Sequence, residues 1–361
     1  FAMRLLLLLI TTFSFSFLIA QPTINPQIAD SLWSVWSDLD KSDSLRIKAM
    51  YSYIWEGYLF SEPDSAFYFS QLVYDIVKEK RDKKGMSVAH LAMGISLTQR
   101  SQYDKAIKHY SEGLALAEDI DDSNLSGYHL SNMGVACEEQ SNYGEAIKYY
   151  LKGLKIDEES GDSLGMGIIL NNIGVVYLSQ EIYPKAITYF DSSIAICKAI
   201  SDTIGIASAL NNLGIAYKEL ERYPEAINCQ ERALKIQRKM KDERGMTSSL
   251  NNLGIVYQML GDFNRAIELH SQSLELTIRG QDKRGEAITL NNLGEAYREK
   301  FDYREAIKYC ERALEIAQEV GVAVEVRSAA KTLSQAYKKL NQFEQALKMH
   351  ELFVETSDSI H

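Results

Sequence analysis

The pattern of hydrophobic, small and polar residues repeats along this chain every forty residues. The phrase Asn-Asn-x-Gly recurs at 171–174, 211–214, 251–254 and 291–294, with weaker copies at 90–94, 131–134 and 331–334. An alanine keeps one phase through eight copies: Ala66, Ala106, Ala146, Ala186, Ala226, Ala266, Ala306 and Ala346. Chance does not hold eight alanines in register, so the chain is a tandem array rather than two or three compact domains.

Each copy predicts two helices. In the copy that begins at residue 247, one helical face appears at the spacing i, i+3, i+4 and i+7, as Leu250, Leu253, Gly254 and Tyr257. The inner face of its partner helix carries Ala266, Leu269, His270 and Leu274. The short connection at 260–263 forces the two helices to pack antiparallel. Small residues at Gly254 and Ala266 predict a close crossing of the pair.

The joints between copies carry a repeated aspartate followed by a glycine, as in Asp242 and Gly245. We expect the aspartate to cap the next helix and the glycine to mark a close approach in its first turn. The resulting units are 47–86, which is degenerate, and then 87–126, 127–166, 167–206, 207–246, 247–286, 287–326 and 327–361. Ahead of them, 21–46 is expected to hold a linker and a capping helix over 28–46, with Trp33 and Trp36.

The run 250–257, with Ala266 and Leu274 downstream, resembles the tetratricopeptide repeat signature, although Leu250 replaces the usual Trp and the closing Pro is absent. The forty-residue period is similar to the longer-helix subclass of kinesin light chains and LGN-type adaptors. The resemblance covers 47–361. It implies an all-α, right-handed superhelical solenoid of helix-turn-helix repeats, whose first helices line a concave groove for a protein or an extended peptide.

If each unit is numbered from its first residue, positions 4, 7, 8 and 11 of the first helix form the core, and positions 2, 5, 9 and 12 form a separate stripe. Position 5 places asparagines in a ladder: Asn171, Asn211, Asn251 and Asn291. Val175, Ile215 and Ile255 lie beside them, and position 12 adds Lys218, Gln258 and Arg298. Because an amide both donates and accepts, the ladder suits an extended peptide backbone. Alternatively, these asparagines bond to neighbouring helices and set the pitch of the array.

Two further polar sets belong to the same helices. Arg298, Lys331 and Lys338 suggest a basic pocket for a carboxylate at the C-terminal end, although a solvated cluster of charges is the favoured interpretation. The second asparagine of each phrase is expected to be structural: Asn132, Asn172, Asn212, Asn252 and Asn292.

Charge and composition exclude several functions. The formal net charge is −10 with no basic face, which disfavours nucleic acid as a partner. None of the six histidines shows HExxH or a comparable ligand spacing, and His270 and His350 read as packed aromatic residues. The sequence has no Gly-rich phosphate-binding loop, and its one GxSxG match, at 161–165, falls at a joint between predicted helices and not at the strand-to-helix turn of a nucleophile elbow. We therefore expect no enzyme activity, no metal and no cofactor. The scattered cysteines Cys137, Cys197, Cys229 and Cys310 predict no disulfide.

An uncharged apolar run at 5–20 follows Met3 and Arg4. Because a membrane-spanning helix needs about 20 apolar residues, we expect 1–20 to be a signal peptide and the chain to be exported, in the periplasm or otherwise outside the cytoplasm. The repeats themselves are not expected to enter a membrane. The first hypothesis for function is an exported scaffold that binds a protein or peptide. The second is the sensory region of a bacterial membrane signalling protein, such as a histidine kinase, adenylate cyclase or transcriptional regulator. The sequence predicts no oligomeric state.

Overall fold

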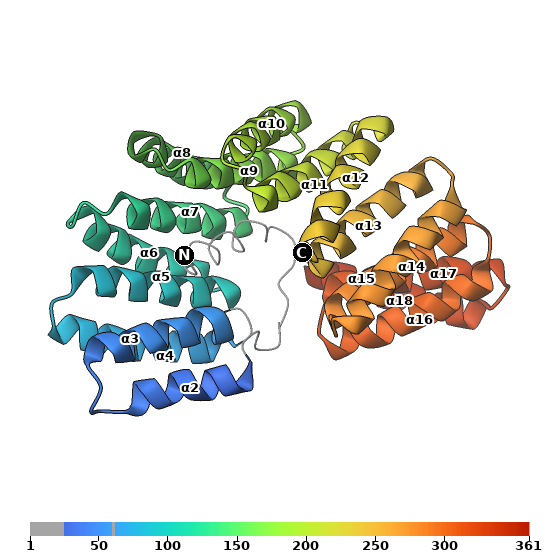
Figure 1. Cartoon of the computed structure of the whole chain (residues 1–361). Helices are drawn as coiled ribbons and strands as arrows, with labels where there is room; N and C mark the ends of the chain where they lie inside the picture. The colour runs from blue at the N-terminus through green and yellow to red at the C-terminus, as the bar shows by residue number, and fades with distance from the viewer. Residues whose placement is uncertain (1–24, 60–61, 361) are drawn as a thin grey trace. The chain divides into compact units, whose positions relative to one another are not determined.

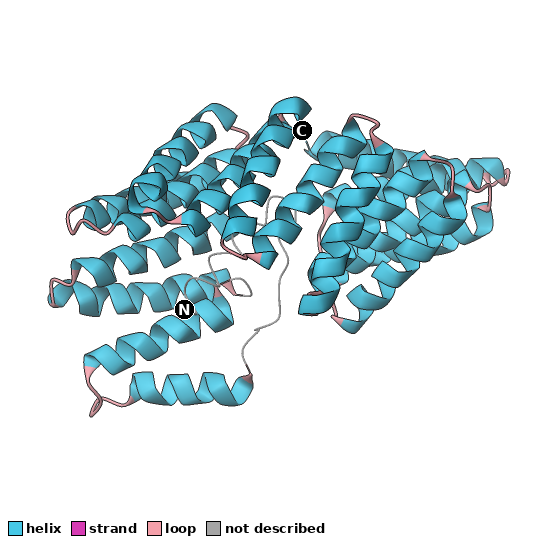
Figure 2. Ribbon diagram, turned by 45° about the horizontal axis from the view of Figure 1, so that its top comes forward, coloured by secondary structure: helices cyan, strands magenta, loops and turns pink. Residues whose placement is uncertain are grey.

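The computed structural model describes residues 25–59 and 62–360. Within those ranges every regular element is a helix, and short turns join the helices (Figure 2). This confirms the all-α prediction. None of these helices is both long and apolar enough to cross a lipid bilayer. The predicted signal peptide at 1–20 lies outside the described residues.

The chain divides into two compact units at Ile206 and Ala207. The first unit contains α2 (Pro26–Ser37), α3 (Asp43–Ser52), the π-helix η1 (Tyr53–Tyr58), α4 (Pro63–Glu79), α5 (Lys83–Gln99), α6 (Tyr103–Glu118), α7 (Ser123–Glu139), α8 (Tyr143–Ser160), α9 (Ser163–Ser179) and α10 (Tyr183–Ala199). The second contains most of α11 (Thr203–Glu219), then α12 (Tyr223–Met240), α13 (Glu243–Met259), α14 (Phe263–Arg279), α15 (Lys283–Glu299), α16 (Tyr303–Glu319), α17 (Ala323–Lys339) and α18 (Phe343–Ile360).

Consecutive helices pack as hairpins, and the hairpins stack. In the first unit α5 packs on α6 and α7 on α8, with α6 packed against α7, so that α5, α6 and α7 lie side by side (Figure 1). The same pattern links α13 to α14, α15 to α16 and α17 to α18 in the second unit. First helices of successive hairpins also contact one another, as α13 contacts α15 and α15 contacts α17. Each hairpin therefore buries its apolar faces against its neighbours.

Capping aspartates set where the first helices begin. Their side chains accept hydrogen bonds from backbone N–H groups in the first turn at Asp82, Asp122, Asp162, Asp202, Asp242 and Asp282. This confirms the predicted caps. Because the cap precedes the helix, α5 begins at Lys83, four residues before the unit drawn from 87. A Cβ on Gly245 would lie 2.2 Å from Asp242 Oδ2, which confirms the close approach expected there.

Each helix from α4 to α17 is followed, within three residues, by a residue with left-handed backbone conformation, and these residues recur every twenty positions from Arg81 to Asn341. Only three of them are glycines, namely Gly161, Gly261 and Gly321. The others include Lys241, Phe301 and Asn341. A residue at positive φ turns the chain sharply and lets the last carbonyls of the helix find donors. The twenty-residue spacing therefore limits the length of the helices from α5 to α17.

Small side chains permit the close crossing of paired helices. All eight phased alanines are buried, with Ala346 the most exposed at 8%. A Cβ on Gly254 would lie 2.5 Å from Cε1 of His270, so a larger residue would collide with that ring. The prediction that His270 packs in the core is confirmed, since its side chain is fully buried. For His350 the same prediction is wrong, because α18 has no following hairpin in the described residues to cover it.

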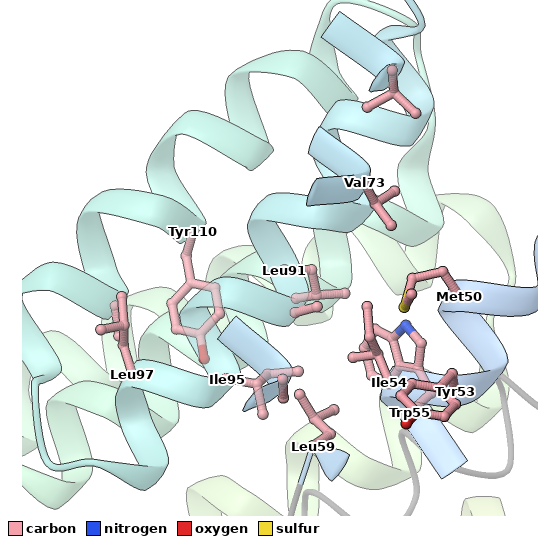
Figure 3. Close-up of a cluster of buried hydrophobic side chains, with 14 of the residues drawn as sticks. Met50, Tyr53, Ile54, Trp55, Leu59, Val73, Leu91, Ile95, Leu97 and Tyr110 are labelled. Atoms are coloured by element: carbon pink, nitrogen blue, oxygen red, sulfur yellow. The ribbon is translucent and has the colours of Figure 1, made fainter. Parts of the chain in front are cut away.

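The N-terminal end departs from the expected single capping helix over 28–46. Helix α2 stops at Ser37, and Ser42 caps a new helix, α3. Trp36 is buried, whereas Trp33 is 40% exposed. Residues of α3 and η1 then form the first core cluster, in which Met50 and Ile54 face Leu91 of α5 (Figure 3). The degenerate first repeat thus starts at Asp43, and its first helix passes into the π-helix η1.

Candidate functional site

The position 5 ladder of the second unit lies on α11, α13, α15 and α17. Asn251 and Asn291 are buried, with 8% and 5% of their surface exposed, while Asn211 is half-buried and Lys331 is exposed. The expectation that this row of side chains points away from the core is therefore wrong for Asn251 and Asn291. The fourth asparagine, Asn171, is also buried, on α9 of the first unit.

The ladder asparagines of the second unit bond to the next repeat. Asn251 Nδ2 donates to Thr289 Oγ1 of α15 at 2.9 Å. Asn291 Nδ2 donates to the backbone oxygen and to Oε2 of Glu325 on α17, at 3.1 and 2.9 Å. Asn211 Oδ1 accepts from Nδ2 of Asn252 on α13 at 3.0 Å. These bonds are the alternative role considered for the ladder, and contact with a ligand stays a prediction.

His270 joins this ladder to position 12. Its Nδ1 lies 3.0 Å from Asn251 Oδ1 and its Nε2 lies 2.9 Å from Gln258 Oε1. Burial lowers the pKa of His270 to about 3, so the ring is neutral and has only one N–H. One of the two amides must therefore turn its NH2 group toward the ring.

The contacts of each amide identify which one turns. Gln258 Nε2 already donates to Glu299 Oε2 at 3.3 Å, and reversing that amide would set two oxygens against each other. Asn251 can reverse and keep its bond to Thr289, since its oxygen would then accept the hydroxyl proton of Thr289. His270 thus carries its proton on Nε2, and one polar chain runs from Glu299 through Gln258 and His270 to Asn251.

At position 12, the charged side chains of Lys218 and Arg298 already have partners. Lys218 Nζ lies 2.7 Å from Glu219. Arg298 donates from Nε to Glu295 at 3.1 Å and from its terminal nitrogen to Glu299 at 3.4 Å, and the bond to Glu295 raises the pKa of Arg298. The suggested carboxylate pocket is therefore occupied at Arg298 by carboxylates of the same helix, in line with the interpretation as a solvated cluster. Lys331 and Lys338 are exposed on α17.

Position 9 provides side chains that remain partly exposed. Ile215 and Ile255 are half-buried, Glu295 is half-buried and Gln335 is exposed. With position 12, they make a continuous stripe on four successive first helices, which we call the first-helix stripe: Ile215, Lys218, Ile255, Gln258, Glu295, Arg298, Gln335 and Lys338. Sequence reasoning placed most of these residues beside the ladder but gave the ladder itself the main role.

The second unit also contains a hollow between second helices, the second-helix hollow, which was not anticipated from the sequence. It measures about 650 Å³ and lies between the second helices α12 and α14, over α13. Leu234, Leu253 and Leu269 line its floor, and Lys235 and Arg265 are among its charged residues. Second helices carry no repeated polar phrase, so periodicity alone offered no signal for this hollow.

The stacked hairpins and their phased glycines and alanines match a known family. The model of the family described as Tetratricopeptide repeat matches residues 85–159, 165–239, 245–319 and 285–354, which is well over half of the chain. The chain belongs to the tetratricopeptide repeat family. Proteins of this family are typically non-enzymatic scaffolds. No curated protein matches the chain.

Solved structures with the same tetratricopeptide-like fold include the apo form of RapI, at 17% identity over 76% of this chain and 98% of that one, with a TM-score of 0.61. Aspartyl phosphate phosphatase F from Bacillus subtilis is 12% identical over 92% of this chain and 95% of its own, with a TM-score of 0.64. The APC/C hetero-tetramer Cut9-Hcn1 is 18% identical over 85% of this chain and 54% of that one, with a TM-score of 0.57. At such identities the similarity shows the fold alone.

Proposed function

We propose that this tetratricopeptide repeat chain is a scaffold that binds an extended segment of another protein along the first-helix stripe of its second unit. The observation that supports this is the stripe itself. The same two positions stay at least partly exposed on α11, α13, α15 and α17, whereas positions 4 and 8 of these helices are buried or small.

The spacing of the stripe suits an extended chain. Packed helices lie about 8–10 Å apart, and an extended peptide rises about 3.3 Å per residue. About three ligand residues therefore span one repeat. Every third side chain of the ligand would then contact the residues at positions 9 and 12 of the next first helix. The stripe is apolar at Ile215 and Ile255 and carries Lys338 at its other end. A matching ligand has an apolar residue and an acidic residue about six positions apart.

The buried asparagines support the stripe instead of forming it. Bonds from Asn251 to Thr289 and from Asn291 to Glu325 tie successive first helices together. A platform held in this way loses little conformational freedom on binding, which favours affinity. The ladder residues Asn171, Asn211, Asn251 and Asn291 are accordingly proposed to act on binding mainly through the geometry of the helices.

A similar fold is found in an assembly of two proteins, since Cut9 and Hcn1 form a hetero-tetramer. Binding of a protein partner is therefore compatible with this architecture.

Selection from a phage-displayed library of twelve-residue random peptides tests the proposal. Selected peptides are expected to share an apolar and an acidic residue six positions apart. The double variant Ile255→Asp, Lys338→Glu should bind them at least about tenfold more weakly, a loss of about 1.4 kcal/mol. Lys235→Glu, on the second-helix hollow, is the matched control and should bind normally. Peptides that lose binding only to Lys235→Glu would place the site in the hollow and overturn the proposal.

Export is proposed separately, on the apolar run at 5–20. An exported scaffold of this kind would also serve as the sensory region of a membrane signalling protein. Fusion of residues 1–46 to alkaline phosphatase, which is active only outside the cytoplasm, should give an active enzyme in bacteria. The same fusion without 5–20 is the control. Equal activity of the two fusions would rule out a signal peptide.

A further inference from the structure

Three metal-ligating side chains converge in the hairpin formed by α5 and α6. His90 lies on α5, and His109 and Glu112 lie on α6. His90 Nδ1 is 3.1 Å from His109 Nδ1 and 3.5 Å from Glu112 Oε2. One ligand atom from each of the three residues lies within 4.8 Å of the other two. This cluster is in the first unit and takes no part in the first-helix stripe.

The hairpin packing brings these residues together. His90 and His109 are 19 residues apart, the same offset that pairs Asn251 with His270 across another hairpin. His109 and Glu112 stand at i and i+3, so they share one face of α6. Because helices rather than loops carry all three residues, their backbone positions are fixed by the packing of the repeat.

Neighbouring aromatic rings hold the two imidazoles in place. Tyr74 of α4 makes an edge contact with His90 at a centroid distance of 4.9 Å, and Phe67 of α4 makes one with His109 at 5.9 Å. These contacts limit rotation of the imidazoles while leaving the two Nδ1 atoms turned toward each other. Such support keeps ligands oriented before an ion arrives.

The distances fit a small divalent ion. In a tetrahedral zinc site with bonds of about 2.0–2.1 Å, two ligand atoms lie about 3.3 Å apart. The separations of 3.1 and 3.5 Å lie on either side of that value. We propose that His90, His109 and Glu112 bind one Zn²⁺, with the fourth position left to water or to a donor atom from solvent.

The ligands are in a suitable chemical state. The hydrogen bond between the two Nδ1 atoms needs a lone pair on one of them, so at least one of the two rings is neutral. Without an ion, one Nδ1–H donates to the other Nδ1. On binding, that proton moves to Nε2 of the same ring, and both Nδ1 lone pairs face the ion. Glu112 is exposed, which gives an ion access from solvent.

Titration of the purified full chain with Co²⁺, whose tetrahedral complexes absorb visible light, tests the site. One Co²⁺ per chain is expected, with a tetrahedral spectrum that Zn²⁺ abolishes by displacement. His109→Ala and Glu112→Gln should each weaken binding more than about tenfold. His350→Ala is the matched control, because His350 is exposed on α18 and far outside this hairpin in sequence; it should bind Co²⁺ as the unaltered chain does.

Thermal melting separates loss of the site from loss of the fold. Zn²⁺ should raise the Tm of the unaltered chain and, at the same concentration, raise that of Glu112→Gln by less. Without Zn²⁺ the two proteins should melt alike, since that exposed substitution preserves the size of the side chain. If no tetrahedral spectrum forms, or if His350→Ala removes it, the three residues are an aromatic and polar cluster only and the proposal is overturned.

Discussion

At single positions, glycines decide how closely the paired helices approach. Gly254 is buried against the ring of His270, and an added Cβ would lie 2.5 Å from it. Gly254→Ala should destabilise the protein by about 1–3 kcal/mol through overpacking, and Gly254→Leu by more. This loss should exceed the gain of about 1 kcal/mol that alanine brings to a helix. Urea unfolding would measure it.

Gly144 of α8 is the control for this substitution, because nothing lies within 4 Å of the position of its Cβ. Gly144→Ala should leave the stability unchanged or raise it slightly. Equal effects of the two alanines would show that His270 does not restrict the space at Gly254.

Left-handed residues at the helix ends offer a second comparison between equivalent positions. Gly261 has φ 79° and Lys241 has φ 57°. A side chain in this conformation costs about 1–2 kcal/mol. Gly261→Ala should therefore lower the free energy of unfolding by about 1 kcal/mol, while Lys241→Gly should leave it unchanged or raise it, by up to about 1 kcal/mol. Thermal melts of both variants would test this, and a stability loss in Lys241→Gly would contradict it.

Asp157 couples stability to pH. Its side chain is buried on α8, and burial, aided by the charge of Asp162, raises its pKa to about 7. Unfolding returns the pKa to about 3.9. The folded state therefore binds the proton more tightly, so stability is highest below pH 4 with respect to this group and falls as the pH rises toward and through 7.

Asp157→Asn should remove this dependence, because its amide is neutral at every pH. The variant should be more stable than the unaltered protein at pH 8, by roughly 4 kcal/mol, and similar to it near pH 4. Urea unfolding at both pH values would measure the difference. An equal effect at the two values would show that Asp157 is ionised in the folded state.

At the scale of the helix, the asparagine ladder connects one first helix to the next. Replacing Asn211, Asn251 and Asn291 by Ala removes bonds to Asn252, Thr289 and Glu325. With each bond worth about 0.5–1.5 kcal/mol, the triple variant should be about 2–4 kcal/mol less stable. Lys331→Ala, at the same repeat position but exposed on α17, should have almost no effect. If the triple variant has the same Tm as the unaltered protein, these amides do not stabilise the array, and the prediction that they contact a ligand would be favoured.

The sequence predicted the helices of this fold better than their polar contacts. The alanines and the Asn-Asn-x-Gly phrases recur every forty residues, and this period alone was enough to predict the helix pairs. Aspartates such as Asp242 mark the start of each first helix, so the caps could also be predicted. Which side chain bonds to which depends on the rotation of one helix against the next. That rotation decides that Asn291 bonds to Glu325 of the following repeat and that His90 lies against His109. Neither contact belongs to a short motif, although the 19-residue offset of hairpin partners would have revealed the second.

For the molecule as a whole, stability is divided among neighbouring hairpins. The cluster that contains Ala287, Leu290 and Ile316 is completed by Val326 and Ala329 of α17. Another cluster, around Tyr150 and Ile173, lies wholly within the first unit. Energy in such an array is a sum of repeat terms and contacts between nearest neighbours, so that damage at one end spreads no further than the contacts that it removes.

Removal of the last hairpin tests this distribution. A chain that ends at Val322 loses α17 and α18, and with them the cover over Ile316 and Leu290. The remaining hairpins should keep their helical circular dichroism per residue, while the Tm falls. Hydrogen exchange should locate the change: amides of α15 and α16 should exchange faster, and those of α5 to α8 should keep their protection. Uniform loss of protection from α5 to α16 would instead mean that the chain unfolds as one cooperative block, against the nearest-neighbour account of the array.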